Sequence, residues 1–268
     1  MMGKPSVHLS LPPASAFQFP PSKSPYTLPP PSSEFTYAPA FDIPPAIYNH
    51  LLHVGYPIAI ALTYAAVVTF LNQVNGQRGG KPWGFSKTPA FFAAVILHNV
   101  ALALYSGWTF AGMWSALSHA WPGWNGPNGV AGAVDALCNM HGPRGLGEAA
   151  TYNGTTKAWS MTSRVSHLAT TGLPDETDVG RIWNEGLAFY GWLFYLSKFY
   201  EIIDTAIILS KGKKSSLLQV YHHTGAMLCM WAGIRYMSPP IWMFVLVNSG
   251  IHTLMVSLRI PALMRSRH

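Results

Sequence analysis

The sequence predicts an all-α fold, a polytopic bundle of membrane-spanning helices, and three observations lead to this prediction. Of the 268 residues, 49% are hydrophobic and only 10% are charged, whereas a soluble domain has about 25% charged residues. Long apolar blocks recur at the length of a membrane helix, and basic residues gather in the loops between them. Two cysteines are too few for a disulfide framework or a four-cysteine zinc site. A net charge of +7 spread along the chain forms no basic stripe, so we expect no nucleic-acid partner.

Residues 1–48 are expected to form a proline-rich tail. The first 45 residues hold 12 of the 22 prolines and show neither helical nor strand periodicity. A segment of this composition buries too little apolar surface to offset the loss of chain entropy on folding. We therefore predict a disordered tail.

Five apolar blocks follow the tail within a predicted transmembrane domain at residues 49–260. A helix needs roughly 20 apolar residues to cross the hydrocarbon core of a bilayer. The third block is longer than that, so it must tilt, bend or extend beyond the bilayer. We place the spans at residues 51–72, 90–117, 183–210, 216–237 and 240–258.

Basic residues in the connections set the expected orientation, because cytosolic loops carry an excess of Lys and Arg. The loops after the first and third spans and the short end at residues 261–268 are basic and contain no acid. We place these segments in the cytosol, and the N-terminus and the connection at 118–182 on the lumenal side. That connection holds Cys138 and a glycosylation sequon at Asn153. Modification of Asn153 and the redox state of Cys138 and Cys229 stay open.

Polar residues inside the spans are functional candidates, because an ionisable side chain at membrane depth costs about 2.5–3.5 kcal/mol on insertion scales. Four of them in the third span stand at i, i+3, i+6 and i+7, which places them along one helical face. The candidates are His98 and Asn99 in the second span; Lys198, Glu201, Asp204 and Thr205 in the third; Gln219, Tyr221, His222 and His223 in the fourth; and Asn248 and His252 in the fifth.

Four candidates from different spans are expected at one depth. At a rise of about 1.5 Å per residue from the nearest loop, each lies roughly 10 to 14 Å below the cytosolic surface. The four are His98, Asp204, His222 and His252. A buried site that opens to the cytosol requires this arrangement. Two structural interpretations stay open: Asn99 as an interhelical hydrogen-bonding residue, and Lys198, Glu201 and Asp204 as a satisfied ion cluster.

Four ordered motifs, over roughly residues 50 to 256, resemble those of the ELO family of fatty acid elongases. The KxxExxDT element matches Lys198, Glu201, Asp204 and Thr205, and the HxxHH box is present as Gln219, His222 and His223, with Tyr221 before the pair. The NxxxHxxMY element matches at Asn248, His252 and Met255. The second-span signature is similar to the stretch that contains His98, Asn99, Tyr105 and Ser106. The chain departs from the pattern at Gln219, which replaces the first histidine, and at Val256, which replaces a tyrosine. Family members continue through further spans, so we expect a truncated form.

The resemblance implies a decarboxylating condensation of malonyl-CoA with a long-chain acyl-CoA, giving 3-ketoacyl-CoA, carbon dioxide and CoA. It implies an acyl-chain tunnel enclosed by the helices, no cofactor beyond the two CoA substrates, and no metal. The expected location is the endoplasmic reticulum membrane. Expected partners are the bilayer, the ketoacyl-CoA reductase, dehydratase and enoyl reductase of the elongation cycle, and a second copy of the chain.

The resemblance also assigns roles to the candidates. His222 is the expected acyl-accepting nucleophile, and His223 orients it or shuttles protons. Gln219 fixes the tautomers of both histidines, and His252 polarises the thioester or malonyl group. Glu201 and Asp204 are expected as proton-relay or orienting carboxylates. The residues expected to bind substrate are Lys198, Thr205, Asn248, Tyr221, His98 and Asn99.

Two alternatives belong to other classes. A di-iron desaturase or hydroxylase would need repeated HxxxH and HxxHH boxes, and the chain contains no HxxxH. A catalytically inactive, truncated elongase would serve only as an interaction partner of the other elongation enzymes.

Overall fold

The computed structural model describes residues 14–20, 40–121, 123–125, 129–138, 150–153, 158–161 and 182–265. Most of the predicted tail, most of the predicted lumenal connection and residues 266–268 lie outside these ranges, as do Gly154 and Thr155 of the sequon. The chain divides into two units, which are described separately below. The first comprises Met1–Leu52, Gly112–Trp192 and Ala232–Trp242; the second comprises His53–Ala111, Leu193–Trp231 and Met243–His268.

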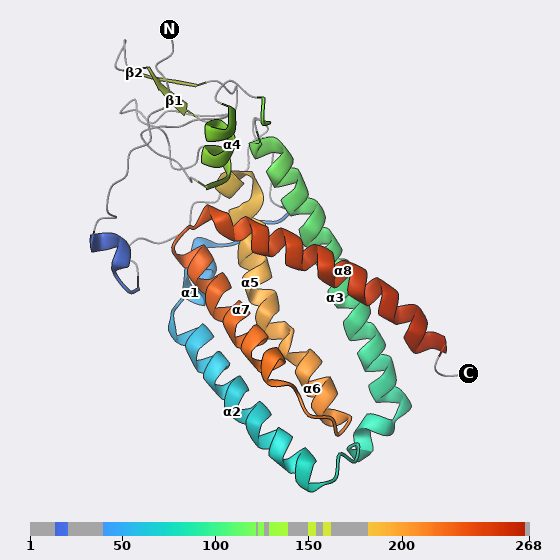
Figure 1. Cartoon of the computed structure of the whole chain (residues 1–268). Coiled ribbons are helices and arrows are strands. Elements are labelled where there is room, and N and C mark those ends of the chain that lie inside the picture. The colour runs from blue at the N-terminus through green and yellow to red at the C-terminus, as the bar shows by residue number, and fades with distance from the viewer. Residues whose placement is uncertain are drawn as a thin grey trace. The chain divides into compact units, whose positions relative to one another are not determined.

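The second unit is built from helices near the predicted spans (Figure 1). They are α2 (Gly55–Gln77), α3 (Pro89–Ala120), α5 (Trp192–Tyr200), α6 (Ile202–Ser210), α7 (Leu217–Arg235) and α8 (Trp242–Arg265), of which α3 and α7 run on into the first unit. The fifth span is longer than predicted. Helix α8 continues to Arg265, through most of the segment expected to form a short cytosolic end.

The third predicted span, which was expected to tilt, bend or extend beyond the bilayer, is divided into successive helical elements. It consists of a π-helix, η3 (Trp183–Gly191), followed by α5 and α6. Helices α5 and α6 are separated at Glu201, whose backbone N–H still donates to the Ser197 carbonyl at 2.9 Å. The next turn tightens, because the N–H of Asp204 donates to the carbonyl of Glu201, three residues back, at 3.1 Å. Residues on either side of Glu201 can therefore face different neighbours.

Two basic loops that were both assigned to the cytosol lie against each other in the second unit. Asn75, which is 1% exposed, joins them. Its Nδ2 donates to the carbonyls of Leu209 at 2.8 Å and Lys213 at 3.1 Å, while its Oδ1 accepts from the Trp83 indole at 2.9 Å. The two loops therefore lie at the same end of these helices, as their common assignment to one side of the membrane requires; their cytosolic location stays a prediction.

Gly212 allows the two loops to approach backbone to backbone. Its φ is +76°, a left-handed conformation that a side chain disfavours. A Cβ at this position would stand 2.4 Å from the carbonyl oxygen of Gly80. The loop pairing therefore requires glycine at position 212.

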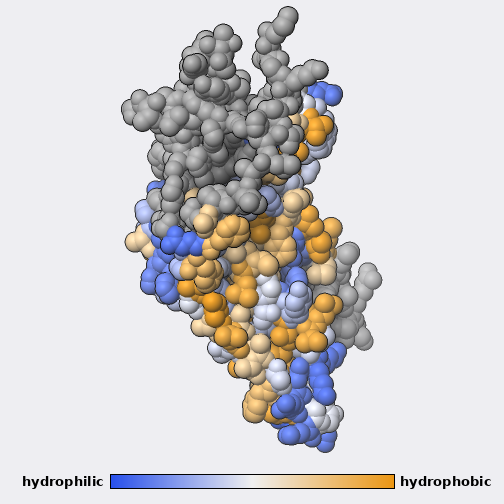
Figure 2. Space-filling model, turned by 60° about the vertical axis from the view of Figure 1, so that its left-hand side comes forward, coloured by the Kyte–Doolittle hydropathy of each residue, from blue (hydrophilic) through white to orange (hydrophobic). Residues whose placement is uncertain are grey.

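Much of the outer surface of the helices is apolar. Figure 2 shows hydrophobic residues over much of the visible face of the helices, with hydrophilic residues at the lower end and along the left-hand side. The large exposed side chains include Leu62 and Phe70 on α2, Leu97 and Leu104 on α3, and Leu254 on α8. A soluble protein rarely exposes so extensive an apolar surface, so this face fits contact with lipid.

Helices α2 and α3 are long and apolar enough, by length and composition, to cross a membrane. The other predicted spans, within the described residues, do not meet the same test. One is divided into shorter helices, and α7 carries Gln219 and the two histidines of the predicted site. The polar site itself thus lowers the hydropathy of the helices that form it.

The first unit contains shorter elements. They are the 3₁₀ turn η1 (Ala14–Phe17), α1 (Pro45–Leu51), α4 (Gly129–Cys138), η3, the 3₁₀ turn η4 (Pro239–Ile241) and a hairpin of β1 (Ala150–Asn153) and β2 (Ala158–Met161). The strands are antiparallel, with Ala150 opposite Met161. Apart from this hairpin the described elements are helical, which confirms the predicted fold class.

Tyr48 anchors α1 in the first unit. Its ring is fully buried and stacks on Trp192 with 5.1 Å between the ring centroids. Its hydroxyl donates to the Ala188 carbonyl at 2.8 Å. Helix α1 begins at Pro45, so an ordered, anchored helix starts before the predicted boundary of the tail at residue 48.

Candidate functional site

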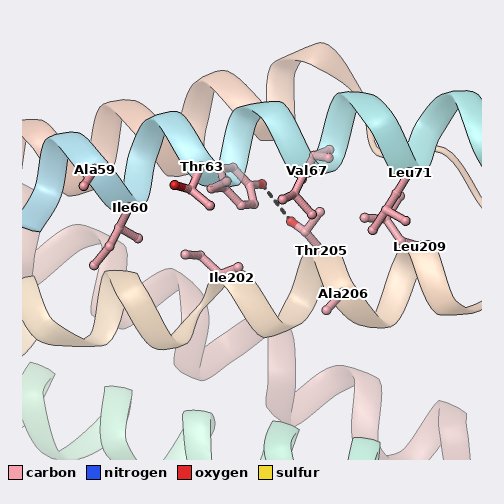
Figure 3. Close-up of a pocket in the computed structure, with 11 residues that line it drawn as sticks. Ala59, Ile60, Thr63, Val67, Leu71, Ile202, Thr205, Ala206 and Leu209 are labelled. Atoms are coloured by element: carbon pink, nitrogen blue, oxygen red, sulfur yellow. Dashed lines mark hydrogen bonds between the residues drawn. The ribbon is translucent and has the colours of Figure 1, made fainter.

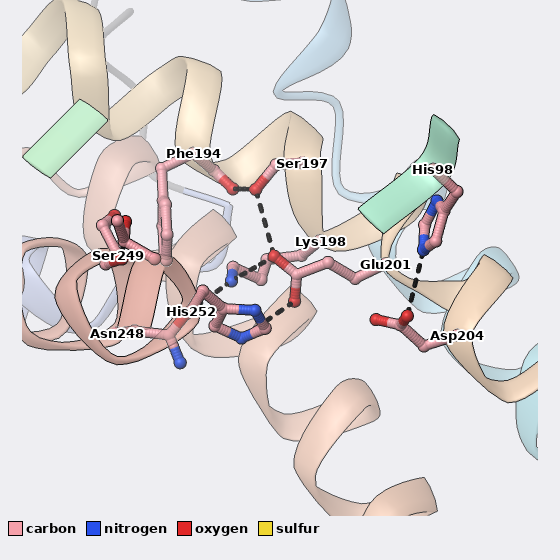
Figure 4. A network of polar contacts seen from close by, with 10 residues as sticks. His98, Phe194, Ser197, Lys198, Glu201, Asp204, Asn248, Ser249 and His252 are labelled. Atoms are coloured by element: carbon pink, nitrogen blue, oxygen red, sulfur yellow. Dashed lines mark hydrogen bonds and ion pairs between the residues drawn. The ribbon is translucent and has the colours of Figure 1, made fainter. Parts of the chain in front are cut away.

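The candidate site lies within the second unit, around the junction of α5 and α6 at Glu201 (Figure 4). Three groups of polar side chains meet there. One joins the junction to α8, one joins it to α3, and one joins it to α2 and α7. The turn at Glu201 lies between residues of a single motif that reach four different helices.

The first group is a buried ion pair with an amide and an imidazole beside it. Lys198 and Glu201 are 1% and 2% exposed. The Nζ of Lys198 donates to Glu201 Oε1 at 2.6 Å and to Asn248 Oδ1 at 2.9 Å. It also lies 3.7 Å from the centroid of the Phe194 ring. A buried cation is tolerated only when it is paired and hydrogen-bonded, and these contacts meet that requirement.

The second oxygen of Glu201 faces His252. The two atoms, Glu201 Oε2 and His252 Nε2, are 4.0 Å apart, too far for a direct hydrogen bond. Oε2 is buried and has no hydrogen-bond partner within the described part of the chain. The carboxylate is thus held through Oε1 and directs its other oxygen toward an imidazole from α8.

The second group pairs His98 of α3 with the first turn of α6. His98 is 6% exposed, and its Nε2 lies 3.0 Å from Asp204 Oδ1. Its Nδ1 lies 2.9 Å from the Tyr200 hydroxyl. Both ring nitrogens are therefore engaged, which fixes the orientation of the ring. The predicted equal depth of His98 and Asp204 agrees with this direct contact.

The third group links α6 to the histidine box of α7. Gln219 Nε2 donates to the Thr205 Oγ1 at 3.1 Å, and Thr205 Oγ1 lies 2.9 Å from the hydroxyl of Tyr64 on α2. The His223 ring packs edge-on against Tyr64, with centroids 5.9 Å apart. His223 is 6% exposed, and its Nδ1 has no hydrogen-bond partner among the described residues.

Three of the residues predicted for the site do not belong to these groups. His222 is exposed, and its ring contacts the His223 ring at a centroid distance of 5.5 Å. Tyr221 is 74% exposed. Asn99 donates to the Val95 carbonyl of its own helix at 2.6 Å. His222 and His252 are thus not paired in the described structure, although similar depth was predicted for both.

Two members of the site were missed by the sequence interpretation. Tyr64 lies in an apolar helix outside all four motifs, and Tyr200 lies between two motif residues. A tyrosine within a span is also typical of ordinary packing or an interfacial belt. Nothing in the local pattern separates these two from the other tyrosines.

The described residues contain no group of three or more His, Cys, Asp or Glu side chains arranged to hold a metal ion. His98 and Asp204 form a pair, and His252 approaches Glu201 alone.

Fold and site define an α-helical membrane protein with a buried polar centre around a helix break. The chain belongs to the ELO family, the GNS1/SUR4 family of polytopic membrane proteins, whose model matches residues 50–258. This confirms the resemblance drawn from the four motifs.

Individual relatives match over shorter stretches. Fatty acid elongase 2 of Trypanosoma brucei brucei is 32% identical over 94 residues, covering 34% of this chain and 35% of that protein. Fatty acid elongase sre1 of Dictyostelium discoideum is 37% identical over 70 residues, 26% of each. Human very long chain fatty acid elongase 3 is 30% identical over 103 residues, 38% of this chain and 37% of that protein. The chain thus spans only 26% to 37% of the length of these relatives. No solved structure matches the chain.

Proposed function

We propose that the chain is a fatty acid elongase that condenses malonyl-CoA with a long-chain acyl-CoA. The observation that carries the proposal is the buried Lys198–Glu201 pair, which directs Glu201 Oε2 toward His252 from another helix. A carboxylate opposite an imidazole selects the tautomer that carries its proton on the facing nitrogen. In that tautomer the other nitrogen of His252 can accept a proton or a hydrogen bond.

The first step is acyl transfer to His222. A neutral imidazole nitrogen attacks the thioester carbon, the C–S bond breaks, and CoA leaves as the thiolate. The proton released from the imidazole passes to that thiolate. The exposed position of His222 supports this role because it leaves the ring accessible to a large substrate.

The second step is carbon–carbon bond formation. Loss of carbon dioxide from malonyl-CoA leaves an enolate, whose carbon attacks the acyl carbonyl and breaks the bond to His222. The departing nitrogen takes a proton from solvent, which restores the neutral imidazole. The product is 3-ketoacyl-CoA. We assign to His252, once its second nitrogen has accepted a proton, the stabilisation of the enolate oxygen, because fixed donors aimed at developing charge lower such barriers. Glu201 orients His252 and offsets the positive charge of its imidazolium form.

We place the enzyme in the endoplasmic reticulum membrane with the site open to the cytosol. The paired basic loops support this orientation, since cytosolic loops are rich in Lys and Arg. Lys211, Lys213 and Lys214 also provide positive charge that would attract the phosphates of CoA. The acyl chain would lie between apolar helices. The reductases and dehydratase of the cycle remain proposed partners.

Microsomes from cells expressing the chain should incorporate labelled malonyl-CoA into longer acyl chains, and His222→Ala should abolish this. The matched control is His53→Asn. The Nδ1 of His53 accepts from the Gly55 N–H at the start of α2, and the Asn oxygen can accept the same bond. Normal membrane insertion without any elongation by the native chain would instead favour the non-catalytic interaction partner.

A further inference from the structure

Tyr64 is a buried residue of the second unit that none of the four motifs includes. It lies on α2 and is 5% exposed. Its hydroxyl is 2.9 Å from Thr205 Oγ1, the contact drawn as a dashed line to Thr205 in Figure 3. It belongs to a core cluster with Leu209 and Met227, so its ring is fixed by packing from α6 and α7.

The Thr205 hydroxyl that contacts Tyr64 also forms a hydrogen bond with Gln219. The amide nitrogen of Gln219 can only donate, so Thr205 Oγ1 accepts from it, at 3.1 Å. The amide oxygen of Gln219 accepts a longer bond, at 3.4 Å, from the Ser215 hydroxyl. Tyr64 therefore holds the first position of the histidine box through one intervening hydroxyl.

Tyr64 also contacts the last position of the box directly. Its ring meets the His223 ring edge-on, at an interplanar angle of 69°. Gln219 and His223 stand one helical turn apart on α7, and α2 reaches both through this one side chain. His222 lies between them in sequence and stays exposed.

The hydroxyls of Tyr64 and Thr205 have few other hydrogen-bond partners around them. Tyr64 and Thr205 line a groove of about 410 Å³ between α2 and α6. Figure 3 shows mainly hydrocarbon side chains along it, among them Ile60, Val67 and Ile202. Water is scarce in such surroundings, so the bond between the two hydroxyls is the stable arrangement.

We propose that Tyr64 is a positioning residue for the histidine box. Its hydroxyl fixes Gln219 through Thr205, and its ring fixes His223. The expected effect on kcat rests on the proposed condensation. The expected effect on the position of the His223 ring does not depend on that reaction. The two consequences are therefore measured separately.

The hydroxyl is tested by kinetics. Tyr64→Phe should lower kcat for condensation about three- to tenfold, the effect of one lost hydrogen bond, with KM for malonyl-CoA unchanged. Because the Tyr64 hydroxyl acts on Gln219 only through Thr205, Tyr64→Phe combined with Thr205→Val should be no slower than the slower single variant. Thr69→Val is the control, since that hydroxyl bonds only its own helix, at the Ala65 carbonyl. A native kcat in Tyr64→Phe, or losses that multiply in the double variant, would overturn the proposal.

The ring is tested without turnover. Purified protein is treated with diethyl pyrocarbonate, and the modification rates of His222 and His223 are read from one peptide by fragment mass spectrometry. Tyr64→Leu should raise the rate at His223 several-fold and leave exposed His222 as an internal reference; Tyr64→Phe, which keeps the ring, should change neither. An unchanged His223 rate in Tyr64→Leu overturns the proposal. Should the native chain prove inactive while His223 responds as expected, the proposed function fails and the positioning role stands.

Discussion

Glu201 and His252 face each other across 4.0 Å, from carboxylate Oε2 to imidazole Nε2. The direction of that carboxylate is set on its other side, where Lys198 donates to Oε1 at 2.6 Å. Lys198 also donates to Asn248, one turn before His252 on α8. One buried lysine thus aligns both the carboxylate and the helix that carries the imidazole.

Breaking this ion pair from one side should destabilise the protein strongly. Glu201→Leu or Lys198→Met alone leaves a buried unpaired charge, a loss of about 3–5 kcal/mol. The double variant removes both charges and should recover most of the unfolding temperature, measured in detergent. It should remain inactive, because His252 has lost its carboxylate. Recovery of elongation in the double variant would contradict the role given to Glu201.

The charge of Asp204 should matter more than the hydroxyl of Tyr200, although both contact His98. Hydrogen bonds to charged groups contribute about 1.5–3 kcal/mol, and neutral ones about 0.5–1.5 kcal/mol. Asp204→Asn should therefore reduce malonyl incorporation well below the level of Tyr200→Phe. The two variants are compared at equal membrane content. Equal losses of incorporation would show that Asp204, like Tyr200, acts only by orienting the His98 ring and that its charge adds nothing.

Spacing along the sequence identified most members of the site, because polar residues within apolar spans are rare and the loops fix their depth. The His98–Asp204 contact could be anticipated in this way. Periodicity, however, describes one unbroken helix. On the two sides of the turn at Glu201, Lys198 contacts α8, Asp204 contacts α3, and Thr205 contacts α2 and α7. The single face predicted for the motif is thus divided among four helices.

Burial within the histidine pair could not be predicted from sequence either. His222 and His223 are adjacent and chemically identical, yet the first is exposed and the second is buried. The buried ring packs against Tyr64, which lies on a helix distant in sequence. Local pattern carries no information on which neighbouring helix covers which side of α7.

The pairing of the two basic loops should depend on the glycine at position 212. Gly212→Ala places a Cβ 2.4 Å from the Gly80 carbonyl oxygen and strains a backbone with φ +76°. We expect a lower unfolding temperature in detergent. Gly84→Ala is the control in the same pair of loops, because a Cβ there has no atom within 4 Å. Equal unfolding temperatures for the two variants would show that the loops separate at little cost.

The paired loops also allow the orientation in the membrane to be tested. In a background with Cys138→Ser and Cys229→Ser, single cysteines are introduced as Lys213→Cys in a basic loop and Val130→Cys in α4. Both positions are exposed. Sealed microsomes present their cytosolic face outward, so a membrane-impermeant maleimide should label Lys213→Cys directly and Val130→Cys only after permeabilisation. The loop should be cytosolic because it carries basic residues without acids, and retention of basic loops in the cytosol is the general rule. The reverse labelling pattern would invert the topology and place the site on the lumenal side, away from cytosolic malonyl-CoA, which would count against both the orientation and the proposed reaction.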